Sequence, residues 1–321
     1  MRFRTFDELT PSMDVDRLLV HLSALGGAAD RDAVALWRRR SDIFADYVGV
    51  FAVEGGRVLG QTLVKRLAYT FPDGTETIGA IASVGTRPDR ARRGVARAIL
   101  TEVHRREREA GIRHVALWTN RSWGAHRLYE QLGYRDIFPV PWALRPPRSG
   151  PTNRHRRRGV RPARAADLPE LDALHDRLAA GRLGFCRRPI RLLELSAATH
   201  EFDPRKEMIV ATKDGRLTGY ALPQPTASRT VCGEIFAATA LARASLVEEI
   251  ERRAKGAPVA FMLTPALDVA RFLTRRGYSA LEAGWYVFMG ADLRRSWSTR
   301  SALARFATRD RRFLCLNGDR F

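Results

Sequence analysis

The first half of the chain alternates between short apolar runs and segments with helical spacing. Residues 78–86 are apolar and small, which is typical of a buried strand, and apolar positions then recur at helical spacing over 98–103. A second apolar run, 114–120, predicts another buried strand, and a helical segment follows, which we expect Ser122 to cap. Strands that alternate with helices in this way favour an α/β fold built on an α+β mixed sheet.

A basic loop, RPDRARRGVAR at 87–97, joins the first of these strands to its helix. Gly94 and Ala96 fall on the first helical turn, where backbone N–H groups lack internal partners and the helix dipole is positive. Small residues let phosphate oxygens come close, and nearby arginines add charge. The loop therefore predicts a pyrophosphate site, while a solvated helix start is the ordinary alternative for so short a motif.

Together, the loop and a later motif resemble the GNAT superfamily of acyl-CoA N-acyltransferases. The family's phosphate loop is Arg/Gln-x-x-Gly-x-Gly/Ala after a strand and a proline, and its later helix carries Leu-Tyr-Glu-x-x-Gly-Phe/Tyr. This chain has Gly94-Val95-Ala96 and then LYEQLGY at 128–134, in the same order. Ala91 departs from the family at the Arg/Gln position, which should weaken the site without abolishing it, because main-chain N–H groups supply most of the binding. The resemblance implies a GNAT fold, acetyl-CoA as cosubstrate and no metal.

The resemblance also implies a role for each residue of the site. Val84, Gly85 and Thr86 would bind the pantetheine arm through their backbone and polarise the thioester carbonyl, although Gly85 could equally mark a bulge. Tyr129 would protonate the departing thiolate while a neutral amine attacks directly; a tyrosine that only packs on the sheet is the alternative. Asn120 would also belong to the cofactor site. The remaining cofactor-binding residues are Arg92, Arg93, Gly94, Val95, Ala96 and Arg97.

A general base for the acceptor amine is harder to assign. The middle of the strand before the loop, 79–82, carries no titratable side chain, and the first-half histidines, at positions 21, 104, 114 and 126, are more simply surface or capping residues. A narrower resemblance, to the enhanced intracellular survival family of acetyltransferases, provides a candidate. That family has an active first GNAT domain, a degenerate second one and a terminal Phe whose carboxylate acts as base, so Phe321 would be catalytic here, with water as the alternative base. Its third, sterol-carrier-like domain cannot fit after Asp292.

The two halves of the chain share landmarks. The motif GRVLG at 56–60 matches GRLTG at 215–219, and each is flanked by runs that predict a hairpin. LGY at 132–134 recurs as RGY at 276–278. The basic loop does not recur, and Leu273 stands where the repeat would place the tyrosine. The second half is therefore predicted to be a degenerate GNAT-like domain that either walls the cleft or mediates a homo-oligomer.

A stretch rich in Pro, Gly and Arg marks the boundary between the halves. We expect a catalytic GNAT domain over 1–147, a linker over 148–159 and a degenerate GNAT-like domain over 160–295. A C-terminal tail over 296–321 would contain one short helix, at 301–308.

Charge and composition limit the remaining function classes. The net charge is +20, but Lys occurs only four times and the arginines are spread over both halves, a pattern that a GC-rich genome also produces. A nucleic-acid binder would gather them on one face and interleave aromatic residues, so a nucleic acid is the weakest of the partners considered. The three cysteines lack zinc-site spacing. Neither a signal peptide nor a membrane-spanning run is evident, which favours a cytoplasmic protein.

These observations lead to one expected function and one main alternative. The chain is expected to be an acetyl-CoA-dependent N-acetyltransferase that acts on a primary amine of a small molecule or a peptide, in a ternary complex. The alternative is a non-catalytic acyl-CoA-binding regulatory protein in which Tyr129 is structural.

Overall fold

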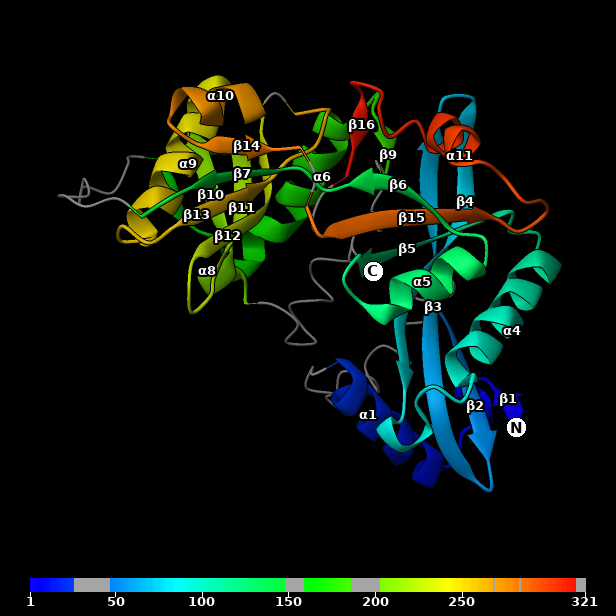
Figure 1. The fold of residues 1–321 in the computed structure, drawn as a ribbon. Helices are drawn as coiled ribbons and strands as arrows, with labels where there is room; N and C mark the ends of the chain where they lie inside the picture. Colours follow the sequence, from blue (N-terminus) through cyan, green and yellow to red (C-terminus); the bar gives the residue numbers. More distant parts are fainter. Residues whose placement is uncertain (26–46, 148–158, 186–202, 268, 283, 316–321) are drawn as a thin grey trace.

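Two mixed β-sheets flanked by helices make up the computed structural model (Figure 1). It describes residues 1–25, 47–147, 159–185, 203–267, 269–282 and 284–315. The elements of the first half are β1 (Arg2–Arg4), η1 (Phe6–Glu8), α1 (Pro11–Leu25), β2 (Tyr47–Glu54), β3 (Arg57–Phe71), β4 (Gly74–Thr86), η2 (Pro88–Arg90), α4 (Val95–Glu109), β5 (His114–Asn120), α5 (Gly124–Gln131), β6 (Arg135–Pro139) and β7 (Trp142–Arg145).

The second half contributes the remaining elements. They are β8 (Val160–Pro162), η3 (Ala165–Asp167), α6 (Leu168–Ala179), β9 (Leu183–Gly184), α8 (Pro204–Glu207), β10 (Ile209–Lys213), β11 (Arg216–Pro225), β12 (Thr230–Ala237), α9 (Ala240–Arg253), β13 (Val259–Met262), α10 (Val269–Arg275), β14 (Ser279–Leu281), β15 (Tyr286–Asp292), α11 (Thr299–Phe306) and β16 (Phe313–Leu314). The predicted α/β class is confirmed by this mixture of sheets and helices.

The two sheets have the same strand order. The first runs β1-β2-β3-β4-β5-β15-β6, with β9 and β16 attached beside β3, and the second runs β8-β10-β11-β12-β13-β7-β14. In each sheet the strand before the principal helix pairs in parallel with the strand after it, β4 with β5 and β12 with β13. The helices that make these parallel connections are α4 and α9.

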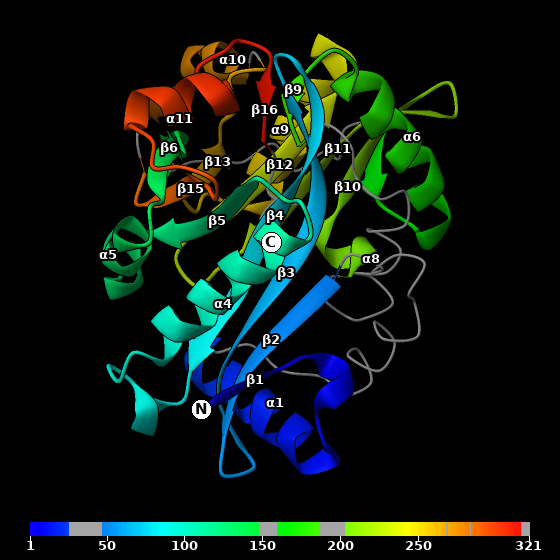
Figure 2. The same ribbon diagram turned by 90° about the vertical axis from the view of Figure 1, so that its right-hand side faces the viewer.

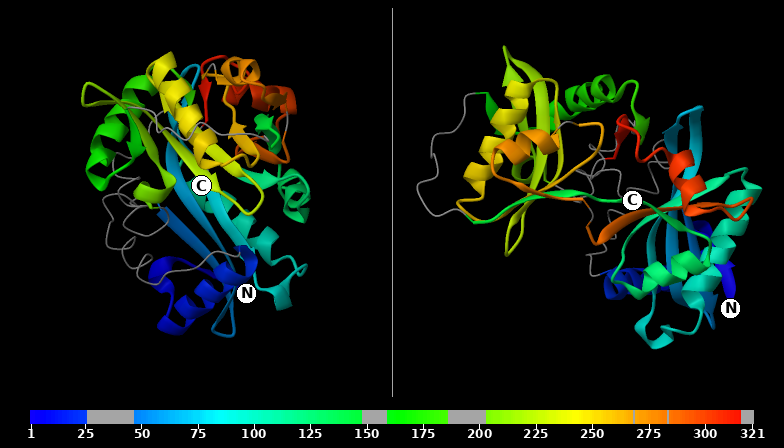
Figure 3. Two further views of the ribbon diagram at one scale, coloured as in Figure 1. Left: turned by 90° about the vertical axis from the view of Figure 1, so that its left-hand side faces the viewer. Right: turned by 45° about the horizontal axis from the view of Figure 1, so that its top comes forward.

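Each sheet takes one strand from the other half of the sequence. β15 lies between β5 and β6 of the first sheet, and β7 lies between β13 and β14 of the second. The green β7 and the orange β15 can be followed from one sheet to the other in Figure 1 and in the right-hand view of Figure 3. The boundaries expected near 147 and 160 are therefore boundaries in sequence, and the sheets do not follow them.

Helices cover both faces of the first sheet. Ile81 packs in one cluster with Val95 and Ile99 of α4, whereas its neighbour Ala82 packs in another with Val20 of α1. Because successive strand residues point to opposite faces, α4 lies on one face and α1 on the other. α5 shares the α4 face through Tyr129.

Residues 299–314 pack on the first sheet rather than standing apart from it. The helix predicted at 301–308 is present as α11, and its Phe306 is buried against Tyr69 and Phe71 of β3. The Tyr69 hydroxyl donates to the Phe306 carbonyl over 2.6 Å, and Arg305 pairs with Asp73 over the same distance. The linker expected at 148–159 lies outside the described residues except for Gly159.

Candidate active site

Strand β4 bulges and then separates from β5. Ser83 has φ of 51°, and the register with β3 shifts so that Leu63 faces Ala82 while Gln61 faces Gly85. The parallel pairing with β5 stops at Ile81, although β4 continues to Thr86. Strand β4 therefore carries a bulge and splays from β5, and Val84, Gly85 and Thr86 lie on its diverging end.

Gly85 owes its lack of a side chain to helix α1. A Cβ atom on Gly85 would lie 3.0 Å from the Ala24 Cβ and 3.6 Å from Val20 Cγ1, on the α1 face of the sheet. Contact with α1 is therefore enough to favour glycine at this position. Gly60 on β3 is constrained in a similar way, because its Cβ would lie 2.8 Å from the Gly85 carbonyl oxygen.

The loop between β4 and α4 exposes the start of a helix. After η2, Arg92 and Gly94 adopt φ of 61° and 79°, and Gly94 becomes the N-cap of α4 with no side chain to bond the first-turn N–H groups. Val95 is buried and anchors the helix, while Ala96 is half-buried. Because the N–H groups of the first turn have no cap, they are suited to receive an anion.

Positive charge surrounds this helix start. Arg87 and Arg90 lie within ion-pair distance of Asp89, but Arg92 and Arg93 are exposed and form no ion pair with any described residue. Arg97 is exposed on the first turn, where its guanidinium donates to the Gln131 side chain at the end of α5. The predicted arginines therefore lie around one helix terminus, as a phosphate site requires.

Tyr129 reaches the same core from α5. It is 6% exposed and packs in one cluster with Val95 and, at the edge, Val84. Among the described residues none forms a hydrogen bond with its hydroxyl, and burial raises its pKa to about 12. The group keeps its proton at neutral pH and is suited to act as an acid rather than a base.

Tyr134 lies beside Tyr129 but is held differently. Their ring centroids are 5.8 Å apart in an edge arrangement, and the Tyr134 hydroxyl lies 2.8 Å from His104 Nε2. Burial lowers the pKa of His104 to about 4, so this imidazole is neutral. Tyr134 has its hydrogen-bond partner within the core and is structural.

Asn120 shapes the turn between β5 and α5. Its side-chain oxygen accepts from the Ser122 backbone N–H at 2.9 Å and from the Ser122 hydroxyl at 2.7 Å. The expected cap at Ser122 is wrong, because α5 begins later and its N-cap is Trp123. Asn120 therefore lies at the splayed end of β5 with its acceptor oxygen already engaged.

The histidines differ from the surface or capping residues expected. His104 and His114 are buried, the latter 3.3 Å from Glu76 and 3.9 Å from Asp292. Burial also lowers the pKa of His114 and of His21. The His21 Nδ1 atom lies 3.1 Å from the Gln61 Nε2 atom. His126 bonds Asp136 over 2.8 Å. The alternating pattern of the sequence gave no signal for these buried polar contacts, because each partner lies on a different element.

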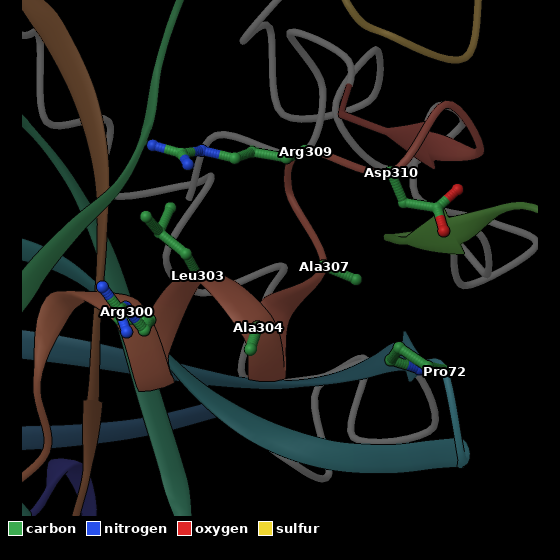
Figure 4. A pocket seen from close by; sticks show the side chains of 7 residues that line it. All are labelled: Pro72, Arg300, Leu303, Ala304, Ala307, Arg309 and Asp310. Atoms are coloured by element: carbon green, nitrogen blue, oxygen red, sulfur yellow. The ribbon is translucent and has the colours of Figure 1, made fainter.

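Two hollows lie on the first sheet. One, of about 460 Å³, runs between α1 and η2 and is lined partly by Leu19, Arg87 and Pro88, next to the basic loop before α4. The other, of about 660 Å³, lies beside α11 and Pro72 and is lined by Arg300, Leu303, Ala304, Ala307, Arg309 and Asp310 (Figure 4). Pro72 lies by the turn where β4 begins, and β4 then extends for about 40 Å before it reaches the cofactor loop. The second hollow is therefore remote from Tyr129.

The matching helix of the second half starts differently. Its N-cap, Thr239, accepts a hydrogen bond from the Ala242 N–H at 3.1 Å, so a side chain already occupies the position that α4 leaves open. Leu273 on α10 is fully buried. In the part of the chain that the structure describes, the exposed basic helix start occurs at α4 and not at α9.

Two further searches of the described residues gave negative results. No group of three or more His, Cys, Asp or Glu side chains is arranged to hold a metal ion. None of the described helices is both long and apolar enough to cross a bilayer. Phe321 lies outside the described residues.

Comparison with known proteins agrees with this geometry. Residues 14–137 match the family model of the acetyltransferase (GNAT) domain. A probable N-acyltransferase from Enterococcus faecalis is 12% identical with a TM-score of 0.64, over 91% of this chain and 73% of that one. A GCN5-related N-acetyltransferase from Kribbella flavida is 20% identical with a TM-score of 0.60, and the match covers 91% of this chain and 72% of that one.

A third solved structure is Eis1 from Mycobacterium abscessus, 18% identical with a TM-score of 0.55, over 91% of this chain and 74% of that one. No curated protein matches the sequence significantly. At such identities the solved structures establish a shared fold and no more. Residues 14–137 are thus similar to a GNAT acetyltransferase domain.

Proposed function

We propose that this protein is an acetyl-CoA-dependent N-acetyltransferase that acetylates a primary amine of a small molecule or a peptide. One observation carries the proposal: Val84 of the splayed strand, Val95 of the uncapped helix and Tyr129 belong to one core cluster. A cofactor-binding strand end, an anion site and a proton donor are thereby held together on rigid elements. Such an arrangement suits transfer from a thioester.

The cofactor would lie along the diverging end of β4. Its pyrophosphate would accept from the first-turn N–H groups of α4, with Arg92 and Arg93 beside it. Its pantetheine arm would pair with the backbone of 84–86, which β5 leaves unpaired beyond Ile81. The main chain supplies most of this binding, so Ala91 in place of the family's Arg/Gln is tolerated.

The reaction would then proceed in a ternary complex. The amine nitrogen forms a bond to the thioester carbonyl carbon, and a backbone N–H near the bulge stabilises the oxyanion. The C–S bond breaks as the intermediate collapses, and Tyr129 gives its proton to the departing thiolate. Holding both reactants in one cleft removes much of the entropic barrier.

The attacking nitrogen must also lose a proton. Ala80 and Ala82, the β4 residues that face the α1 side, carry no base. We assign this role to the terminal carboxylate of Phe321 and keep water as the alternative. The assignment rests on the resemblance to the enhanced intracellular survival family and on the lack of a titratable group in the middle of β4.

The second half would be a degenerate GNAT-like domain. The repeated strand order, the Thr239 cap where α4 has Gly94, and the buried Leu273 in place of a tyrosine all support this assignment. Its strand β15 borders the cleft of the first half, so it would act as a wall of that cleft.

A screen of amine acceptors with acetyl-CoA, following release of free thiol, tests the function. An N-acetyltransferase releases thiol only when an accepted amine is present. Tight CoA binding without release from any amine in a broad panel would instead identify a regulatory acyl-CoA-binding protein. Affinity for DNA or RNA that falls steeply with salt would favour the nucleic-acid class.

A further inference from the structure

Aromatic side chains follow the ladder between β5 and β15. Trp118 stands opposite Phe288 in the register, and their ring centroids are 4.9 Å apart with an interplanar angle of 31°. Two pairs further along, Asn120 stands opposite Tyr286, whose ring is 6.3 Å from that of Trp123. We call Trp118, Phe288, Tyr286 and Trp123 the aromatic wall.

The wall grows more exposed from Phe288 toward Tyr286 and Trp123. Phe288 is fully buried and Trp118 is half-buried, whereas Tyr286 is 37% and Trp123 is 54% exposed. Large exposed aromatic residues that gather in one place mark a binding surface more often than a random surface does. Here they come from both halves of the chain.

The position of the wall relative to the sheet identifies its role. Trp118 is the first residue of β5 beyond the last pair with β4, so it lies where the two strands begin to separate. Phe288 packs with Phe306 of α11, whereas the neighbouring Val287 packs with Tyr129. Because side chains alternate along a strand, Trp118, Phe288 and Tyr286 face away from α4 and Tyr129.

This face is the one from which the acceptor must come. If the proposed function holds, the cofactor enters from the start of α4 with its sulfur toward Tyr129, and the carbonyl lies in the gap between β4 and β5. The amine then attacks from the opposite face, past Ala80 and Ala82 on one side and the aromatic wall on the other.

We infer that the acceptor is a primary amine with an aromatic carbon skeleton. A flat ring would stack against Tyr286 and Trp123 while its aminoethyl arm reaches the gap beside Trp118. Asp136, near the same end, already bonds Arg121 and His126, each over 2.8 Å, so it does not present a free carboxylate to a polycation. The net charge of +20 also disfavours a polyamine. The inference rests on the proposed function and deepens it.

The test compares acceptors and matched variants of the full chain. Thiol release is measured with tryptamine, phenylethylamine and spermidine, for the wild type and for the double variant W123A/Y286A. Leu241→Ala is the control, because Leu241 is 71% exposed on α9, away from the wall. The variant W123F/Y286F keeps both rings. Circular dichroism confirms that each variant is folded.

We expect kcat/KM to be at least about tenfold higher for the aromatic amines than for spermidine. The double alanine variant should lose about tenfold for the aromatic amines, mainly through KM, while the KM for acetyl-CoA stays unchanged. W123F/Y286F and Leu241→Ala should retain the wild-type preference. An unchanged KM for the aromatic amines in W123A/Y286A would overturn the inference.

Two other outcomes separate the inference from the function on which it rests. Release with spermidine alone, unaffected by the wall variants, would refute the acceptor class and leave the acetyltransferase assignment intact. Release with no amine of any kind would overturn both.

Discussion

Asn120 at the end of β5 and Tyr286 at the start of β15 face each other across the ladder of the first sheet, although they belong to opposite halves of the chain. The neighbouring Arg121 N–H donates to the Trp285 carbonyl over 2.9 Å and continues this contact into the loop. The splayed end of β5 is therefore held in place by the second half. The candidate site lies in the first half by motif, yet both halves build it.

The exchange of strands predicts that the first half does not fold alone. Without β15, strands β5 and β6 lose their shared neighbour, and the apolar contacts of Val287, Phe288 and Met289 are lost. We expect residues 1–147 to show no cooperative thermal transition by circular dichroism. Co-expression with residues 148–321 should restore it. A sharp transition in the isolated first half would contradict this prediction.

Tyr129→Phe should lower kcat by about 10²–10⁴-fold and leave the KM for acetyl-CoA within about twofold, because only proton donation is lost. Tyr134→Phe is the matched control: it removes a neighbouring hydroxyl, which bonds His104 instead of facing the cleft. That variant should lose about 1 kcal/mol of stability and keep its kcat. Equal kcat losses in both variants would argue that Tyr129 is merely structural.

Gly94→Ala should weaken CoA binding more than it weakens the fold. Gly94 and Gly111 flank the two ends of α4, both have φ of 79°, and in both a Cβ would meet no atom within 4 Å. Each alanine variant should therefore cost a similar free energy of unfolding, about 1 kcal/mol. Calorimetric titration with CoA should show a raised Kd for Gly94→Ala alone. The same Kd for CoA in Gly94→Ala and Gly111→Ala would show that the loop before α4 does not bind CoA.

A short extension after Phe321 should lower kcat without changing the Kd for acetyl-CoA, since it moves the proposed base. An extension of equal length at the N-terminus is the control. If the carboxylate is the base, the acidic limb of the pH profile of kcat/KM should also change in the extended protein. Full activity of the C-terminally extended protein would leave water as the base.

His104 should make the fold sensitive to acid. Its folded-state pKa of about 4 lies below the ordinary value of 6.5, so protons bind preferentially to the unfolded chain. The stability from the neutral imidazole is complete above pH 6.5 and is lost as the pH falls toward 4, by up to about 3 kcal/mol. The check is urea unfolding of the wild type and of His104→Gln at pH 7.5 and at pH 5. The free energy of unfolding should fall less between these two pH values in His104→Gln than in the wild type. An equal fall in both proteins would show that groups other than His104 cause the acid sensitivity.

Local pattern was enough to predict several parts of the site. The apolar run at 114–120 coincides with β5, and the run at 78–86 is the second part of β4. Gly94 lies at the start of its helix as expected, because a left-handed residue before a helical pattern is a local requirement. Tyr129 was found because its motif is contiguous in sequence.

The sequence alone therefore determined the fold class, and it supplied the proposals for the basic loop before α4 and for Tyr129 as the acid, all of which depend on residues close together in the chain. Only the tertiary structure decided that β7 and β15 change sheets, that Gly85 faces α1 and that Asn120, not Ser122, organises the turn into α5. Strand pairing and packing join residues far apart in sequence, and nothing in a local hydrophobic pattern specifies which distant partner completes a sheet edge.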